Sequence, residues 1–183
     1  MRKLVITENM TLDGVIDMSG GWFDPASGDA DQADLTAATA EHSAAADALL
    51  VGRNTFEAFR GFWPQQTDDT TGVTAYLNGV AKYVVSRTID DPGWANTTVL
   101  RGPLVEEVRR LKDAPGRDIV ATGSTQLVHA LMAADLVDEF RLFVFPVVVG
   151  GGARLFESAR PALRLVEARP FVSGAVLLRY ATR

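Results

Sequence analysis

The chain has 183 residues, of which 47% are hydrophobic and 22% charged, as is usual for a globular protein with one sizeable core. Its formal net charge of −5 argues against a nucleic-acid or anionic-membrane partner, because no basic surplus is present to neutralise phosphates. The absence of cysteine excludes disulfides, thiol nucleophiles and thiolate metal sites. We expect one domain over residues 1–183 and a cytoplasmic location, since the chain starts directly with a strand pattern and its longest apolar run, 142–149, is too short to span a bilayer.

Strand and helix patterns alternate along most of the chain. In chain order they predict a strand (3–7), a helix (33–46), a strand (48–51), a short helix (54–59), a polar, turn-rich stretch (61–79), a strand (81–86), a helix that opens at Pro103, a strand (118–121), a helix (124–132) and three further strands (140–149, 163–168 and 174–180). This order predicts an α/β fold in which a mostly parallel sheet carries an antiparallel C-terminal edge.

A long loop is expected over residues 18–31, where glycines and a proline surround Trp22 and Phe23. Loops with aromatic anchors often cover binding sites. We therefore interpret this segment as a lid, with Trp22 and Phe23 against the substrate.

Three segments at strand ends carry the main functional signal. They are 51–56, 85–88 and 121–126, and each places small residues or an arginine after an apolar strand. Ligands of open α/β sheets bind at the carboxyl ends of the strands. Glycine allows close approach of the backbone to a phosphate, and a helix that begins there points its free N–H groups at the anion. The set predicts a phosphorylated nucleotide cofactor held across one sheet.

Each segment also has a structural interpretation. Gly52, Arg53 and Thr55 fit either a phosphate site or an ordinary helix start with an exposed arginine. Ser86 and Arg87 fit either a ribose 2′-phosphate or a strand end with a surface charge.

The third segment is equally open. Ser124 or Thr125 can cap the helix that follows Gly123, or a phosphate can take the amides instead. The segment is not a G-x-G-x-x-G fingerprint, because Thr125 and Val128 stand at the second and third glycine positions.

The remaining chemical groups are sparse. Asp13, followed by Gly14, is by default a turn residue. His42 and His129 both fall on predicted helices with no second ligand or nucleophile nearby, so we interpret them as structural and expect no metal site.

Taken together, these segments resemble the dihydrofolate reductase-like superfamily. The closer match is to the reductase domain of the bifunctional riboflavin-biosynthesis deaminase/reductase and to its stand-alone relatives. The matching segments are Met10–Gly14, Leu50–Phe56, Tyr83–Arg87, Gly123–Thr125, Asp138–Leu142 and Pro146–Gly152, so the resemblance spans nearly the whole chain.

The resemblance implies a three-layer α/β/α fold, a homodimer and an oxidoreductase that uses NADPH to reduce a small heterocyclic or carbonyl-type substrate. By analogy, Gly52, Arg53 and Thr55 would hold the adenosine phosphates, Ser86 and Arg87 the 2′-phosphate, Gly123, Ser124, Thr125 and Gln126 the pyrophosphate and nicotinamide side, and Leu12, Asp13 and Gly14 would pack near the nicotinamide.

One position departs from the family pattern. Dihydrofolate reductases carry a carboxylate on the helix before the Gly-Arg strand, and the matching position here falls near Thr36, with Asp34 about half a turn away. Folate is therefore not the expected substrate, and the proton could come from Asp13, Asp34 or ordered water.

Two alternatives remain open. One is 5-amino-6-(5-phosphoribosylamino)uracil reductase of riboflavin biosynthesis, which would need a substrate-phosphate site such as Arg154 or Arg160. The other is a non-catalytic NADP(H)-binding protein.

Overall fold

The structure is a computed structural model, and it describes residues 1–18, 20–23, 32–157 and 160–183. Its strands are β1 (Leu4–Thr11), β2 (Ala46–Gly52), β3 (Ala81–Val85), β4 (Thr97–Leu100), β5 (Asp118–Ala121), β6 (Glu139–Phe145), β7 (Leu163–Pro170) and β8 (Val176–Thr182). Its helices are α1 (Ala33–Ala44), α2 (Arg53–Phe62), the 3₁₀ turn η2 (Trp63–Gln65), α3 (Val73–Gly79), α4 (Leu104–Asp113) and α5 (Thr125–Ala133).

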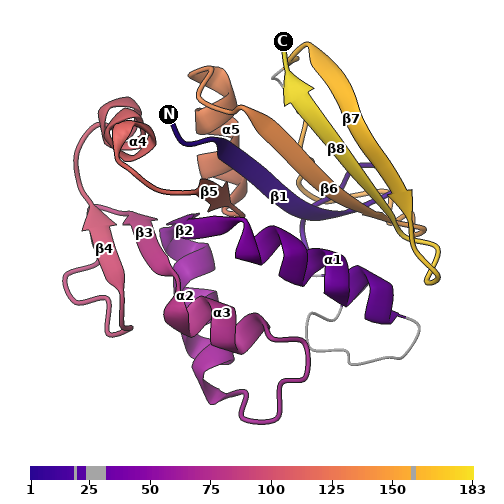
Figure 1. The fold of residues 1–183 in the computed structure, drawn as a ribbon, viewed down its shortest axis with the longest axis horizontal. Coiled ribbons are helices and arrows are strands. Elements are labelled where there is room, and N and C mark those ends of the chain that lie inside the picture. The colour runs from indigo at the N-terminus through magenta and orange to yellow at the C-terminus, as the bar shows by residue number, and fades with distance from the viewer. Residues whose placement is uncertain (19, 24–31, 158–159) are drawn as a thin grey trace.

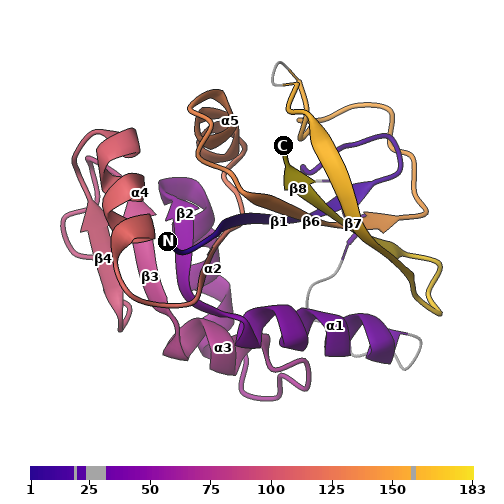
Figure 2. The ribbon, with the colours of Figure 1, turned by 45° about the horizontal axis from the view of Figure 1, so that its top comes forward.

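The strands form one sheet in the order β4-β3-β2-β5-β1-β6-β8-β7. The first six in this order run parallel, and β8 and β7 add an antiparallel edge to β6. Helices α4 and α5 cover one face, and α1, α2 and α3 lie along the other (Figures 1 and 2). The predicted α/β/α fold with an antiparallel C-terminal edge is confirmed.

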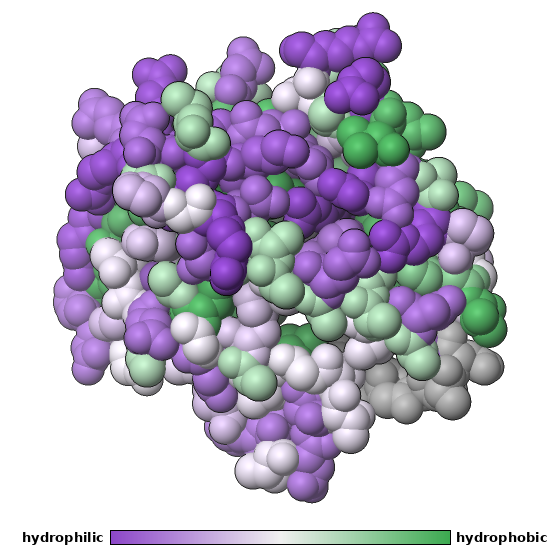
Figure 3. All heavy atoms as spheres, viewed as in Figure 1, coloured by the Kyte–Doolittle hydropathy of each residue, from purple (hydrophilic) through white to green (hydrophobic). Residues whose placement is uncertain are grey.

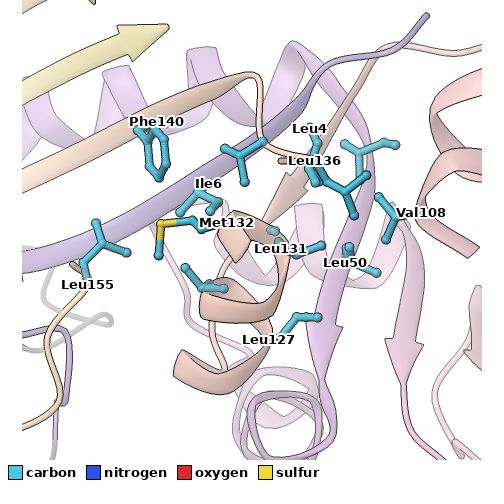
Figure 4. Close-up of a cluster of buried hydrophobic side chains, with 14 of the residues drawn as sticks. Leu4, Ile6, Leu50, Val108, Leu127, Leu131, Met132, Leu136, Phe140 and Leu155 are labelled. Atoms are coloured by element: carbon cyan, nitrogen blue, oxygen red, sulfur yellow. The ribbon is translucent and has the colours of Figure 1, made fainter. Parts of the chain in front are cut away.

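The central strands contribute side chains to two hydrophobic cores, because successive side chains point to opposite faces of the sheet. Leu50 joins the cluster under α4 and α5 (Figure 4), while Leu49 and Val51 join the cluster under α2 and α3. A third cluster, which includes Leu35 of α1, covers the antiparallel edge. Burial on both faces explains why residues 48–51 form a continuous apolar run.

A strip of ion pairs crosses the sheet on the α1 face. Arg141 on β6 binds Asp118 on β5 at 2.8 Å and Glu139 at 2.8 Å, and Arg179 on β8 binds Glu139 at 3.0 Å and Glu167 on β7 at 3.0 Å. The strip therefore ties together strands from the parallel and the antiparallel parts of the sheet.

Several elements differ from the sequence-based expectation. The strand predicted over 140–149 ends at Phe145, because Pro146 has no N–H to donate to the ladder. The segment 61–79 contains α3, whose start is held by the Asp69 carboxylate through the amides of Thr71 and Thr74. Strand β4 was not predicted at all. Within the described ranges, no helix has the length and apolar character needed to cross a bilayer.

Candidate functional site

The three strand-end segments meet at one edge of the sheet. Gly52 is paired with Val85 of β3, and Leu50 is paired with Ala121 of β5, so the carboxyl ends of β2, β3 and β5 lie side by side. Helices α2 and α5 begin directly after β2 and after the β5 loop (Figure 2). The structure thus brings together the segments that the sequence singled out.

Two glycines allow these segments to pack against each other. A Cβ at Gly52 would collide with the Ser124 hydroxyl oxygen, and a Cβ at Gly123 would lie 2.6 Å from the Thr55 hydroxyl oxygen. Gly123 also has a φ of +45°, and its peptide bond to Ser124 is cis. Larger residues at either position would push the loop after β5 away from the start of α2.

In the described part of the chain, the N-cap residues leave the first amides of α2 and α5 without a side-chain acceptor. Gly52, the N-cap of α2, has no side chain, and the Ser124 hydroxyl, at the N-cap of α5, makes no capping hydrogen bond. The capping interpretation of Ser124 is therefore not what the structure shows. Two uncapped N-termini side by side suit a ligand with two adjacent phosphates.

Arginines extend this edge of the sheet. Arg53 follows β2 and lies 3.8 Å from Glu57, whereas Arg87 follows β3, is exposed and has no carboxylate within ion-pair distance in the described part of the chain. The Ser86 hydroxyl accepts the amides of Thr88 and Ile89 at 3.2 Å each, so it shapes the turn that presents Arg87.

A third arginine was missed from the sequence. Arg101 follows β4 and donates to the carbonyls of Arg87 and Ile89, and it also lies 3.6 Å from Asp90. The arginines thus follow three neighbouring strands. The signal was the same as after β2, an arginine beside a glycine, but β4 itself had not been recognised.

Asp13 holds two loops together. Its carboxylate accepts hydrogen bonds from the Thr11 hydroxyl at 2.6 Å and the Gly150 amide at 2.9 Å, and its carbonyl accepts one from Arg154. The hydrogen bond from Thr11, with those from the backbone, lowers the pKa of Asp13 below its usual range. An ionised carboxylate accepts but does not donate a proton at neutral pH. The neighbouring Leu12 is exposed, and Gly14 has a φ of +87°.

Asp34 points to the antiparallel edge. One of its carboxylate oxygens accepts the Leu35 amide at 2.8 Å, and the other accepts the amide of Val172, in the β7–β8 turn, at 2.9 Å. Thr36 is half-buried on the same helix. The structure therefore places the Asp34 carboxylate on a turn between strands, where it has two backbone partners.

Three aromatic rings border the site at the end of β6. The Trp22 and Phe23 rings lie 5.7 and 5.2 Å from that of Phe145, and the Trp22 indole N–H donates to the Asp17 carbonyl at 2.8 Å. Because Phe145 is paired with Thr11 at the end of β1, these rings stand beside the Asp13 turn. Residues 19 and 24–31 of the expected lid lie outside the described residues.

Glu8 was not singled out from the sequence. It is only 4% exposed in the middle of β1, and its Oε1 accepts the Gly123 amide at 2.7 Å. Burial raises the pKa of Glu8 to about 7. The available signal was a carboxylate between Ile6 and Met10 in an otherwise apolar alternation.

Both histidines have structural surroundings. His42 is buried against Phe143, and burial, with the charges of Arg141 and Arg179, lowers its pKa to about 4. The Nε2 of His129 lies 3.0 Å from the carbonyls of residues 154 and 155. Among the described residues, no group of His, Cys, Asp and Glu is arranged to hold a metal ion.

A cavity of about 460 Å³ opens at the opposite end of the parallel strands, where β2 and β3 begin. It lies between α1 and α3 and is lined by Thr39, Ser43, Asp47 and Tyr76 among others. None of the strand-end segments reaches it, so it is separate from the site described above.

Comparison with known proteins points to one family. Residues 2–177 match the model of the RibD C-terminal domain. The chain is 32% identical to the uncharacterized protein YyaP of Bacillus subtilis (strain 168), over 98% of this chain and 94% of YyaP.

Solved structures share the fold. A putative riboflavin biosynthesis protein from Shewanella sp. PV-4 superposes with a TM-score of 0.70 at 19% identity, over 99% of both chains. A pyrimidine reductase-like protein from Corynebacterium diphtheriae gives 0.67 at 15% identity, over all of this chain and 92% of the other.

Proposed function

Because the chain belongs to the RibD C-terminal domain family, we propose that it is an NADPH-dependent reductase that transfers hydride to a small heterocyclic, carbonyl or imine substrate. The observation that carries the proposal is the pair of uncapped helix starts at Gly52 and Ser124, packed together through Gly52 and Gly123. This arrangement supports binding of a pyrophosphate. Bound nicotinamide would supply the hydride, and the protein would supply binding and orientation.

The residues have distinct roles in this proposal. The amides of Thr55, Thr125 and Gln126 face the pyrophosphate, and Arg53 neutralises part of its charge. Arg87 binds the 2′-phosphate from the turn that Ser86 shapes, and Arg101 holds that turn in place. Leu12 and Gly14 lie near the nicotinamide.

Proton delivery is assigned by elimination. Asp13 has a lowered pKa and is ionised at neutral pH, and the Asp34 carboxylate is bound by two backbone amides. Water is therefore the proton source in our proposal, and Asp13 acts by fixing the turn beside the nicotinamide.

The aromatic rings of Trp22, Phe23 and Phe145 suit a planar substrate, because a flat heterocycle can pack against such rings. The riboflavin-pathway alternative needs an anion site for the substrate phosphate. Arg154, a candidate for it, is bound by the backbone and the carboxylate of Asp13, and Arg160 is exposed. Of the two candidates, the exposed Arg160 is the one that a substrate phosphate could reach, so the ribosylaminopyrimidine phosphate stays the alternative to an unphosphorylated heterocycle.

Calorimetry and turnover test the function. NADPH should bind at micromolar to submillimolar concentrations, and its absorbance should fall steadily with an accepted heterocycle. Arg87→Ala should weaken NADPH binding by about 1.5–3 kcal/mol and leave NADH binding nearly unchanged. Arg109→Ala, on the exposed face of α4, is the matched control. Equal weakening of both cofactors would remove the 2′-phosphate assignment, and binding without turnover on any substrate would favour the non-catalytic alternative.

We further propose a single domain over residues 1–183 that forms a homodimer. The edge strand β7 exposes Leu165 and Val166 at 52% and 44%, and Figure 3 shows apolar surface near it on the face in view. Light scattering should give twice the chain mass of 19.7 kDa, and Leu165→Lys should give the monomer mass.

A further inference from the structure

Glu8 stands directly behind the loop that the proposed cofactor would touch. Its side chain points to the α5 face of the sheet, because its neighbours Ile6 and Met10 belong to the cluster packed under α5. The hydrogen bond from the Gly123 amide, at 2.7 Å, is the single hydrogen bond of this carboxylate among the described residues. A buried carboxylate with one neutral donor is poorly compensated for its charge.

We propose that Glu8 is a positioning residue which takes up a proton when a dinucleotide binds, so that cofactor affinity is coupled to pH. This inference rests on the function proposed above. A pyrophosphate on the α5 amides would bring negative charge to the loop that Glu8 already contacts through Gly123. Like charges in a site screened from water disfavour the ionised form of the weaker acid, which here is Glu8.

Few other charges face Glu8. On β6, Glu139 and Arg141 pair with Val5 and Thr7 and so point to the opposite face of the sheet. On α5, the single titratable side chain is His129, which is bound to two backbone carbonyls. The other charged groups of the packed elements are Asp118 on β5, paired with Arg141, and three on α2. Of these, Arg53 and Glu57 pair with each other, and Arg60 donates to the Pro92 carbonyl at 2.8 Å.

Burial is therefore the main determinant of the proton on Glu8 in the free protein. It raises the pKa to about 7, the Gly123 hydrogen bond opposes it, and no charged side chain contributes. Near neutral pH the free carboxyl is partly ionised, and a small further rise on binding changes its protonation. The charge of the cofactor supplies that rise.

Protonation preserves the contact with the loop. A neutral carboxyl keeps a carbonyl oxygen that accepts the Gly123 amide, and its new O–H adds a donor. Glu8→Gln reproduces this state, since the amide also has an accepting oxygen and no charge. The variant should therefore hold the loop as the protonated wild type does.

Calorimetry counts the proton. NADPH is titrated at pH 7.5 in two buffers with different ionisation enthalpies, a pH at which its 2′-phosphate, with a pKa of about 6, is already ionised. Wild type should take up roughly half a proton per cofactor, and Glu8→Gln should take up none. The control Glu106→Gln, which removes an exposed carboxylate on α4, should match wild type.

Affinity and infrared spectra provide independent checks. Glu8→Gln should equal wild type in NADPH affinity at pH 6 and exceed it by up to roughly tenfold at pH 8. The infrared difference spectrum of wild type should gain a protonated-carboxyl band on NADPH addition, which needs no variant.

The outcomes separate the two proposals. Binding without proton uptake by wild type, or with uptake that persists in folded Glu8→Gln, overturns the role of Glu8 and leaves the reductase proposal standing. No NADPH binding at millimolar concentration overturns both.

Discussion

Replacing His42 should reduce the loss of folding stability that the protein undergoes as the pH falls. Both ring nitrogens of His42 are buried without a hydrogen-bond partner among the described residues, and the charges of Arg141 and Arg179 add to the penalty of protonation. The folded pKa of about 4 lies below the ordinary 6.5, so the unfolded chain binds the proton more readily. The neutral imidazole thus contributes stability that is fully present above pH 6.5 and is lost as the pH falls toward 4.

The pKa difference gives the magnitude. A difference of about 2.5, at about 1.36 kcal/mol per unit, corresponds to roughly 3 kcal/mol below pH 4, and to about 2 kcal/mol between pH 7.5 and pH 5.0. His42→Phe has no proton to bind and places a ring beside Phe143. Its free energy of unfolding should fall by about 2 kcal/mol less than that of wild type over this interval.

Urea unfolding at the two pH values measures the free energies, and proton NMR provides the control. The chain has two histidines, so the one histidine signal that remains in His42→Phe belongs to His129. The signal that disappears is assigned to His42. A His42 ring that titrates near pH 6.5, or an equal loss of stability in wild type and variant, would refute the reasoning.

Three further predictions concern the site. Glu8→Gln should raise the free energy of unfolding by up to about 3 kcal/mol at pH 8 and leave it nearly unchanged at pH 4.5. The reason is that the folded pKa of Glu8, about 7, makes wild-type stability decline as the pH rises from 4.5 to 7. An equal gain at both pH values in urea unfolding would contradict this. Gly123→Ala should lower the free energy of unfolding by about 1–3 kcal/mol in the same assay and weaken NADPH binding. The control Gly61→Ala, in a helix with open space around its Cβ, should stabilise the fold by up to about 1 kcal/mol. Similar effects for both variants would show that the Thr55 contact does not matter. Trp22 fluorescence should change when NADPH or substrate binds, measured against Trp22→Phe to subtract the other tryptophans, and an unchanged difference signal with binding confirmed would exclude the lid.

The sequence predicted the class of the fold, a mostly parallel sheet with an antiparallel C-terminal edge, from local patterns along the chain. Residues 48–51 and 119–121 are short apolar runs between helices, and such runs are typical of parallel strands buried on both faces. Strand β4 escaped because only Leu100 of its residues is buried. Helix α3 escaped for the same reason, since only Leu77 is buried.

The meeting of the strand-end segments was predictable from the sequence, but their contacts were not. The glycines and arginines follow strands that run parallel, and the carboxyl ends of parallel strands meet at one end of a sheet. The partner of Glu8 could not be found, since Gly123 lies 115 residues away and no local pattern encodes that contact. Asp13 was placed near the site, yet the neighbours that lower its pKa include Gly150, from a distant loop.

The ion-pair strip under α1 fixes how the late strands can align. A shift of β8 by one residue along β6 would turn Arg179 to the other face of the sheet and leave Glu139 and Glu167 without it. Glu139 would keep Arg141, and Glu167 would keep Arg169, so the cost falls on Arg179, which would lose both of its carboxylate partners. Charge pairing therefore favours the native register of β8 on β6, in addition to the apolar packing of the same strands.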